Sequence, residues 1–139
     1  MIKKCDVVII GAGAAGMMCA IEAGKRGRKV VLLDHAKKIG EKIRISGGGR
    51  CNFTNIYTDH RKFISSNPNF MISALKQYTH HNFINLIQKY QISFHEKKLG
   101  QLFCDQSAQQ IIDMLKKECE KANVLLHNNT NVESISKSQ

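Results

Sequence analysis

The sequence predicts an α/β protein that opens with a β-strand, an α-helix and a second strand parallel to the first. Two short runs rich in β-branched and apolar residues, 5–10 and 29–34, have the composition of strands buried on both faces. A glycine-rich turn follows the first run, and residues 17–25 then have helical composition up to Gly27, which is placed to follow the helix cap. Because strand, turn, helix and strand fit within about 30 residues, they predict a βαβ unit with parallel strands.

Size and composition are consistent with one globular domain. The chain has 139 residues, of which 42% are hydrophobic, so it can form a real core and is not a wholly disordered chain. Lys and Arg number 21 against 11 Asp and Glu, a net charge of +10. The window 25–62 holds 11 of the basic residues and three acids, so most of the net charge lies there. Such a charge raises a nucleic acid or an anionic surface as a rival hypothesis.

The cysteines indicate a reducing compartment. There are five, an odd number, with no CxxC pair and no zinc spacing, so we expect free thiols, no metal site and a cytoplasmic location. The apolar run 7–21 is interrupted by glycines and follows Asp6, which disfavours a cleaved signal. No stretch approaches the roughly 20 apolar residues of a membrane span, so we expect no membrane partner.

The remainder of the chain predicts further helices and strands. Residues 35–59 lose periodicity and are expected to be irregular, and such a long connection is usually functional or mobile. Pro68 favours a helix over 67–78, and Thr79 is placed to cap a second helix that ends near Tyr90. Ser107 and Gln110 match a capping box for an amphipathic helix that reaches Lys121. We also expect a hairpin of 92–95 with 102–104, and strands at 124–127 and 131–136.

The turn Gly11–Gly16 has the GxGxxG pattern between a predicted strand and a predicted helix, the context that this pattern needs. Gly11 permits the tight turn, Gly13 lets a pyrophosphate approach the backbone, and Gly16 lets the helix lie close to the strand. The first helical amides, near Ala14 and Ala15, would face the diphosphate. The alternative is tight strand–helix packing without a ligand.

Asp34 ends the second strand, where a carboxylate can accept hydrogen bonds from ribose hydroxyls. The same charge disfavours a 2′-phosphate, and therefore NADP, at this turn. The turn alone does not separate FAD from NAD.

A second glycine-rich segment, residues 40–55, favours FAD. Three consecutive glycines stand between Ser46 and Arg50, and Lys42 and Arg44 add positive charge. Their backbone amides would contact a second part of an extended ligand such as FAD. A nicotinamide-binding domain does not need a second glycine-rich loop at this point of the chain. The alternative is a loop that is only flexible.

The chain resembles the flavoproteins with two dinucleotide-binding domains. Within them it is similar to the bacterial NAD(P)/FAD-dependent oxidoreductases, also described as aminoacetone-oxidase-family FAD-binding proteins, which include dehydro-bile-acid reductases. The resemblance rests on VIIGAGAAG at 8–16, AGKRG at 23–27 and above all GEKIRISGGGRCNFTN at 40–55. It implies a Rossmann-like FAD-binding fold with NAD(P)H as a transient co-substrate.

The resemblance also implies site residues. The glycine turn 11–16 would hold the FAD pyrophosphate, and the end of the strand 29–34 would meet the adenosine ribose. The glycine-rich segment 40–55 would line the flavin half, and the strand expected at 131–136 would meet adenine through its backbone. These candidates are Gly11, Gly13, Ala14, Ala15, Gly16, Asp34, His35, Lys42, Ser46, Gly49, Arg50, Cys51, Asn52 and Val132.

Two departures from the family pattern matter. Cys104 replaces a proline that usually follows Phe103 in the family, and family members are considerably longer. We therefore expect residues 1–139 to form the N-terminal part of an incomplete FAD-binding domain, without the substrate domain and the later FAD segments.

Other chemistries have weaker support. Cys51 could be a redox thiol, but the position five residues on is Ile56, so no second cysteine follows. The histidines lack ligand spacing, and no catalytic acid or base can be named. No nucleic-acid motif accompanies the basic window, and part of its charge is explained by a nearby diphosphate, so a nucleic-acid partner is not favoured. The leading hypothesis is an FAD-binding oxidoreductase of unknown substrate. The alternative is a truncated fragment that binds FAD weakly or not at all and catalyses nothing.

Overall fold

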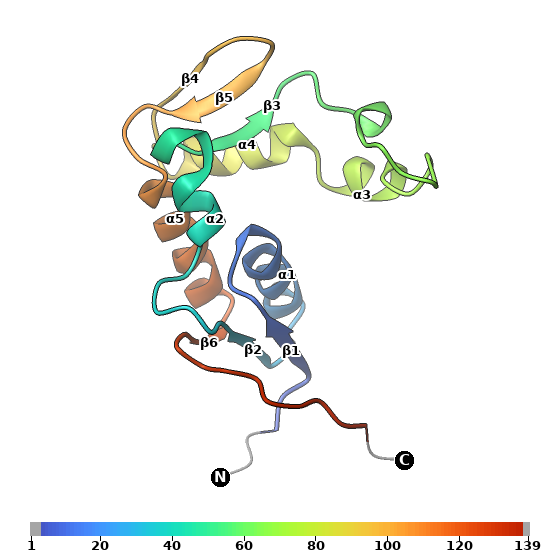
Figure 1. Ribbon diagram of the computed structural model, residues 1–139, viewed down its shortest axis with the longest axis vertical. Coiled ribbons are helices and arrows are strands. Elements are labelled where there is room, and N and C mark those ends of the chain that lie inside the picture. Colours follow the sequence, from blue (N-terminus) through green and yellow to red (C-terminus); the bar gives the residue numbers. More distant parts are fainter. Residues whose placement is uncertain (1–3, 138–139) are drawn as a thin grey trace. The chain divides into compact units, whose positions relative to one another are not determined.

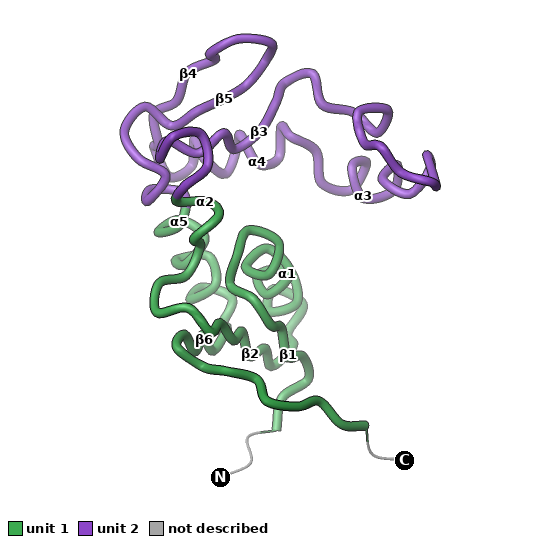
Figure 2. The backbone as a smooth tube through the Cα atoms, in the orientation of Figure 1, with its two compact units in different colours: residues 1–44, 112–139 green, residues 45–111 purple. Residues whose placement is uncertain are grey.

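The computed structural model describes residues 4–137, and the chain divides into two compact units (Figure 2). Unit 1 comprises residues 1–44 and 112–139, and unit 2 comprises residues 45–111.

Unit 1 contains a parallel three-stranded sheet in the order β1 (Val7–Ile10), β2 (Val30–Leu33), β6 (Leu125–His127) (Figure 1). β1 pairs with β2 from Val7 opposite Val30, and β2 pairs with β6 from Val31 opposite Leu125. The predicted α/β class with a parallel βαβ unit is therefore confirmed.

Two helices supply the core of unit 1. Helix α1 (Ala14–Lys25) joins β1 to β2, and α5 (Gln109–Lys121), most of which lies in unit 1, precedes β6. The helices touch directly, since the Cys119 thiol lies 3.8 Å from the Met17 carbonyl oxygen, and a Cβ at Gly24 would collide with the Ala122 carbonyl oxygen. The apolar side chains buried between helices and sheet include Met17, Ala20, Ile21, Val30, Leu32, Ile112, Leu115 and Cys119.

The face of the sheet away from α1 is open. Ile9 points toward α1, because its Cγ2 lies 3.5 Å from where a Cβ on Gly16 would stand. Side chains alternate along a strand, so Val8 and Ile10 point the other way, and each is 55% exposed. Leu125 on β6 is 53% exposed. Apolar side chains are thus left in water on a parallel sheet.

Unit 2 contains an antiparallel sheet in the order β3 (Asn52–Asn55), β5 (Gln101–Cys104), β4 (Phe94–Glu96). The pairing of β4 with β5 confirms the predicted hairpin. Helix α4 (His80–Lys89) is capped by Thr79, as predicted, and Asn82 completes the capping box. Helix α3 (Ile72–Gln77) and a 3-10 turn at His60–Lys62 lie between β3 and α4.

Residues 35–59 are more ordered than predicted. They contain α2 (Glu41–Ile45), a 3-10 turn at Ser46–Gly49 and β3. Strand β3 is the polar sequence Asn-Phe-Thr-Asn, so it has no apolar run of its own. It is a strand because it pairs with β5, from Asn52 opposite Phe103, and local periodicity cannot show such a distant partner.

The predicted helix at 67–78 is shorter than expected, and the predicted strand at 131–136 is not formed. The helix expected from residue 67 begins at Ile72, because the Asn67 side chain accepts a hydrogen bond from Asn69 N (3.1 Å) and holds a local turn instead. The strand expected at 131–136 is absent, and these residues are exposed with no strand pairing in the described chain. Thr130 N donates to the Asp34 carbonyl oxygen (2.9 Å), which ties the start of this segment to the loop after β2.

The N-termini of α1 and α5 differ in detail from the prediction. Helix α1 begins at Ala14, three residues before the predicted start, directly out of the glycine turn. Ser107 Oγ accepts from Gln109 N (3.1 Å), while Gln110 Oε1 is buried and has no hydrogen-bond partner among residues 4–137. Ser107 therefore caps the helix without the predicted reciprocal bond. Within residues 4–137, no helix is long and apolar enough to cross a membrane.

Candidate dinucleotide-binding site

The glycine turn joins β1 to α1 in a geometry that leaves little freedom. Gly11 has a φ of 105°, a left-handed conformation that suits glycine, and its N–H donates to the Leu33 carbonyl oxygen (2.7 Å). A Cβ at Gly16 would collide with the Gly11 carbonyl oxygen. Helix α1 therefore lies against the turn only because residue 16 has no side chain.

Gly13 differs from Gly16 in its surroundings. A Cβ at Gly13 would meet no heavy atom of the described residues within 4 Å, so the space next to this residue is open. Gly13 is also the N-cap of α1, and it provides no side-chain acceptor to the first helical amides. The first turn contains no acidic residue, and Ala14 and Ala15 are exposed. This helix end thus presents N–H donors and a partial positive charge to open space, which suits an anionic group.

Asp34 follows β2 and holds the turn in place. Its Oδ2 accepts from Ala12 N (2.6 Å) and its Oδ1 accepts from Ala36 N (2.7 Å). The side chain is only 11% exposed. Each carboxylate oxygen keeps a second lone pair, so the group can still accept a bond from a hydroxyl. The sequence predicts that Asp34 lies beside the turn. No residue pattern predicts that its carboxylate accepts hydrogen bonds from the backbone of Ala12 and Ala36.

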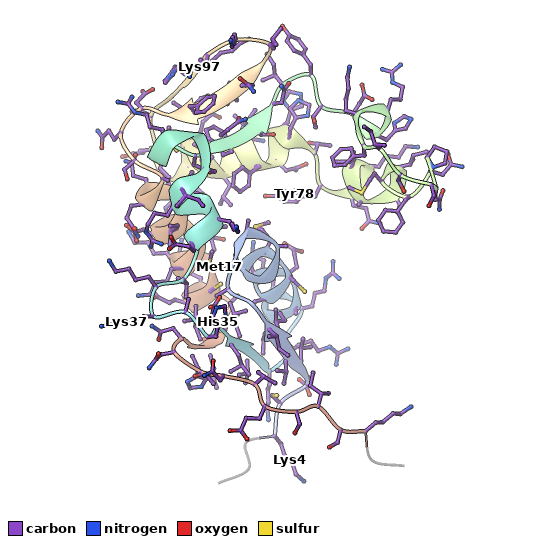
Figure 3. The ribbon with its side chains drawn as sticks, in the orientation of Figure 1. Lys4, Met17, His35, Lys37, Tyr78 and Lys97 are labelled. Carbon is purple, nitrogen blue, oxygen red and sulfur yellow. The ribbon has the colours of Figure 1, made fainter. Side chains whose placement is uncertain are left out.

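The neighbouring candidates are less constrained. Figure 3 labels His35 in the loop after β2; its side chain is 83% exposed, and Nδ1 lies 3.7 Å from Asp34 Oδ1. Lys42 is exposed on α2. Arg44 donates to the Ile39 carbonyl oxygen from both terminal nitrogens (3.2 and 3.3 Å) and has a structural role. Val132 is 39% exposed and lies in the irregular segment after Thr130, not on a strand.

The remaining candidates, Ser46, Gly49, Arg50, Cys51 and Asn52, belong to unit 2. Gly47, Gly48 and Gly49 all have positive φ, and Cys51 does too (53°). Cys51 N donates to the Ser46 carbonyl oxygen (3.0 Å), Ala108 N to Gly49 O (2.8 Å) and Arg50 Nη1 to Asp105 O (2.8 Å). A Cβ at Gly47 would lie 2.7 Å from the Phe103 ring. The loop is therefore held by specific contacts on several sides, which disfavours the alternative of simple flexibility.

A second cysteine does lie close to Cys51. Cys104 N donates to the Arg50 carbonyl oxygen (2.9 Å), and both thiols are buried. Burial raises the pKa of the Cys51 thiol, and burial together with Cys51 raises the pKa of Cys104 to about 11. Both thiols are therefore neutral at physiological pH and poor nucleophiles. Sequence spacing missed this pair because it depends on the distant pairing of β3 with β5.

Two residues of the basic window lie away from the glycine turn. Lys25 and Arg26 lie at the other end of α1, whose 12 residues span about 18 Å. Lys25 pairs with buried Glu118 (3.5 Å), and Arg26 pairs with Glu22 (3.8 Å). A diphosphate at the glycine turn therefore does not explain the charge of these two residues, because the length of the helix separates them from the turn.

The fold and the turn define the class of protein: unit 1 has the parallel β1–α1–β2 arrangement and the glycine turn of a Rossmann-type dinucleotide-binding unit. The family model described as "HI0933-like protein Rossmann domain" matches residues 5–139. The chain belongs to this family.

Curated relatives agree with this assignment. The chain is 54% identical over 137 residues to "Ribosomal RNA dihydrouridine synthase" of Escherichia coli, covering 99% of this chain and 34% of the relative. It is 51% identical over 128 residues to the protein of the same name from Haemophilus influenzae, covering 91% of this chain and 32% of the relative. A "3-dehydro-bile acid delta(4,6)-reductase" of Clostridium scindens is 29% identical over 131 residues, with 91% and 32% covered. The chain thus spans about a third of the length of these relatives.

A solved structure supports the fold. The chain matches the 3-ketosteroid-delta4-(5alpha)-dehydrogenase of Rhodococcus jostii with a TM-score of 0.60 and 14% identity, covering 90% of this chain and 38% of that one. The predicted resemblance to dehydro-bile-acid reductases is confirmed in the Clostridium relative, whereas the aminoacetone-oxidase part of it stays a prediction.

Proposed function

We propose that this chain is the FAD-binding, N-terminal part of a flavoprotein that reduces uridine to dihydrouridine in ribosomal RNA. The observation that carries the proposal is the 54% identity to the Escherichia coli synthase, which runs through 99% of this chain and so includes both glycine-rich segments. The open space at Gly13 and the uncapped end of α1 support the binding of a diphosphate. A ribosomal RNA substrate departs from our expectation of no nucleic-acid partner, which rested on the lack of a known motif and on a diphosphate that explains part of the basic charge.

The reaction defines what the residues must do. Dihydrouridine has two more hydrogen atoms than uridine, at C5 and C6 of the base, so its formation needs two electrons and two protons. Bound FAD supplies a two-electron carrier between NAD(P)H and the uracil ring. In our proposal this chain binds and orients the cofactor: the glycine turn holds the diphosphate, Asp34 and His35 face the ribose, and the backbone at Val132 faces adenine. By the family resemblance, Lys42 and residues 46–52 would line the flavin half.

The alternative is a fragment that binds FAD weakly and catalyses nothing. One observation favours it: Val8, Ile10 and Leu125 leave an apolar sheet face in water. Parallel sheets in α/β proteins have both faces covered, so a chain with this face open is expected to be less stable and to bind less tightly. The five free thiols support a cytoplasmic location for the protein under either alternative.

Thermal denaturation with cofactors distinguishes the two. FAD at 100 times its dissociation constant stabilises the native state by about 2.7 kcal/mol, and FMN and NADH serve as matched controls. We expect FAD alone to raise the melting temperature. A chain that purifies without flavin and whose melting is unchanged by FAD would contradict the binding proposal.

The activity is tested on the full-length gene product in its own cells. Deletion of the gene should remove dihydrouridine from ribosomal RNA, measured by mass spectrometry of digested nucleosides, and a plasmid copy should restore it. Unchanged dihydrouridine content in the deletion strain would refute the proposed reaction while leaving FAD binding to the first experiment.

A further inference from the structure

Residues 57–81 of unit 2 run from just after β3 into the first turn of α4 and expose several large apolar side chains; we refer to them as the β3–α4 segment. Tyr57 is 63% exposed, Phe63 41% and Phe70 69%, and Ile64 is fully exposed. Single exposed apolar residues are common, but four within a short stretch are unusual on a protein surface. Large apolar side chains left exposed in this way are a feature of surfaces that contact another molecule.

The same segment is basic. It contains three Lys or Arg (Arg61, Lys62 and Lys76) and three of the six histidines, against one acid. The acid, Asp59, is engaged by Arg61, whose Nη2 lies 3.0 Å from Asp59 Oδ2. Lys62 also faces Asp59 and helps to lower the pKa of that carboxyl, whereas within residues 4–137 Lys76 forms no ion pair. Three cations against one acid leave the segment with a net charge of +2, which attracts an external anion.

A cavity of about 400 Å³ lies in this segment. Its apolar lining comes from Ile72 and Leu75 of α3, and its polar lining includes Lys76, His80 and Asp59, the carboxylate that Arg61 engages. The volume is within the range of pockets that take small organic groups. Apolar surface beside a lysine suits a planar base that carries a phosphate.

We propose that the β3–α4 segment binds an unpaired stretch of RNA, an inference that rests on the proposed function. Exposed aromatic rings on which bases stack, combined with cations that contact phosphates, are the features by which proteins bind single-stranded nucleic acid. Tyr57 and Phe70 supply the rings, Lys62 and Lys76 contact phosphates, and the cavity accepts one base. The charge favours RNA over a protein partner, because lysine is depleted at protein–protein interfaces.

The test measures binding of the 139-residue chain to a fluorescein-labelled, uridine-rich, single-stranded 12-mer RNA by fluorescence anisotropy, over a range of salt concentrations. The Phe70→Ala and Tyr57→Ala variants are expected to bind at least about fivefold more weakly, since each stacked base contributes about 1–3 kcal/mol. Tyr57→Phe keeps the ring and is expected to bind as the wild type does. Lys76→Gln is expected to reduce the slope of log K against log salt by about 0.7.

Matched controls separate a specific surface from general charge. Lys117→Gln removes one exposed lysine of α5 in unit 1 and is expected to leave binding and salt slope unchanged. Circular dichroism and the FAD-dependent melting shift report whether each variant is folded, since none of these residues belongs to the cofactor site.

The outcomes distinguish this inference from the proposed function. If the wild type binds no RNA, or Phe70→Ala and Lys76→Gln bind as tightly as Lys117→Gln, the inference is wrong even where the gene-deletion experiment succeeds. The same conclusion follows if Lys117→Gln weakens binding equally. If the variants lose RNA binding while the deletion strain keeps its dihydrouridine, the RNA surface stands and the proposed reaction fails.

Discussion

The two glycines of the turn make opposite predictions, which Gly16→Ala and Gly13→Ala test in the absence of any cofactor. At position 16 the new Cβ would collide with the Gly11 carbonyl oxygen. Backbone atoms cannot rotate aside, so α1 must move away from the turn. That movement disturbs the packing of Met17, Ala20 and Ile21, which are buried against the sheet.

The expected size follows from known substitutions. Overpacking a close contact costs about 1–3 kcal/mol, and weakening the bond from Gly11 N to Leu33 O costs about 1 kcal/mol more. The higher helix propensity of alanine relative to glycine offsets about 1 kcal/mol of this loss. We expect Gly16→Ala to lower the free energy of unfolding by about 2 kcal/mol, or roughly 7 °C in Tm for a chain of this size.

Gly13→Ala is the matched control. Gly13 has a φ of −85° and a ψ of −170°, which any residue adopts, and no atom lies within 4 Å of the new Cβ. Its stability is expected to lie within about 0.5 kcal/mol of the wild type. Urea denaturation followed by circular dichroism measures both variants. Equal stabilities for Gly16→Ala and Gly13→Ala would refute the packing role of Gly16.

Three further predictions concern the cofactor site and the thiols. Gly13→Val is expected to keep the wild-type circular dichroism spectrum but to lose the FAD-dependent melting shift, because the larger side chain fills the open space above the turn. Asp34→Asn is expected to lower the free energy of unfolding by about 2 kcal/mol without any cofactor, since the new amide nitrogen must face one of two backbone N–H donors. A variant with wild-type stability and only weaker FAD binding would show that the carboxylate acts on the ligand alone. Burial raises the pKa of Cys104 and Cys119 to about 11 from 9.0, so both stabilise the fold below pH 9, and this stability is lost as the pH rises from 9 through 11. Urea titrations at pH 8 and 10 check the loss, and at pH 8 exposed Cys19 should react with a disulfide reagent before either buried thiol.

The sequence predicted those parts of the fold whose signals are local. β1, α1 and β2 each carry their own periodicity and are separated by glycines, and Thr79 with Asn82 lies within one helical turn. What failed depends on distant partners: β3 exists through its pairing with β5, and residues 131–136 form no strand because no strand pairs with them in the described chain. The candidate site followed the same rule. The turn was found from its spacing, whereas the Asp34 bonds to Ala12 and Ala36 and the nearby Cys104 emerged only from the fold.

The bonds of Asp34 change how its role should be understood. If the only role of the Asp34 carboxylate were to bind a ribose, its side chain would face water and become ordered when the ligand binds. Here both oxygens already accept backbone N–H groups from either side of the strand end, and the Gly40 N–H in turn donates to the Ala12 carbonyl oxygen (3.0 Å). The turn is therefore held in place before any ligand arrives, so binding a diphosphate does not require ordering this part of the backbone. It follows that Asp34 connects two properties, the stability of unit 1 and its affinity for a dinucleotide, and that a substitution here changes both.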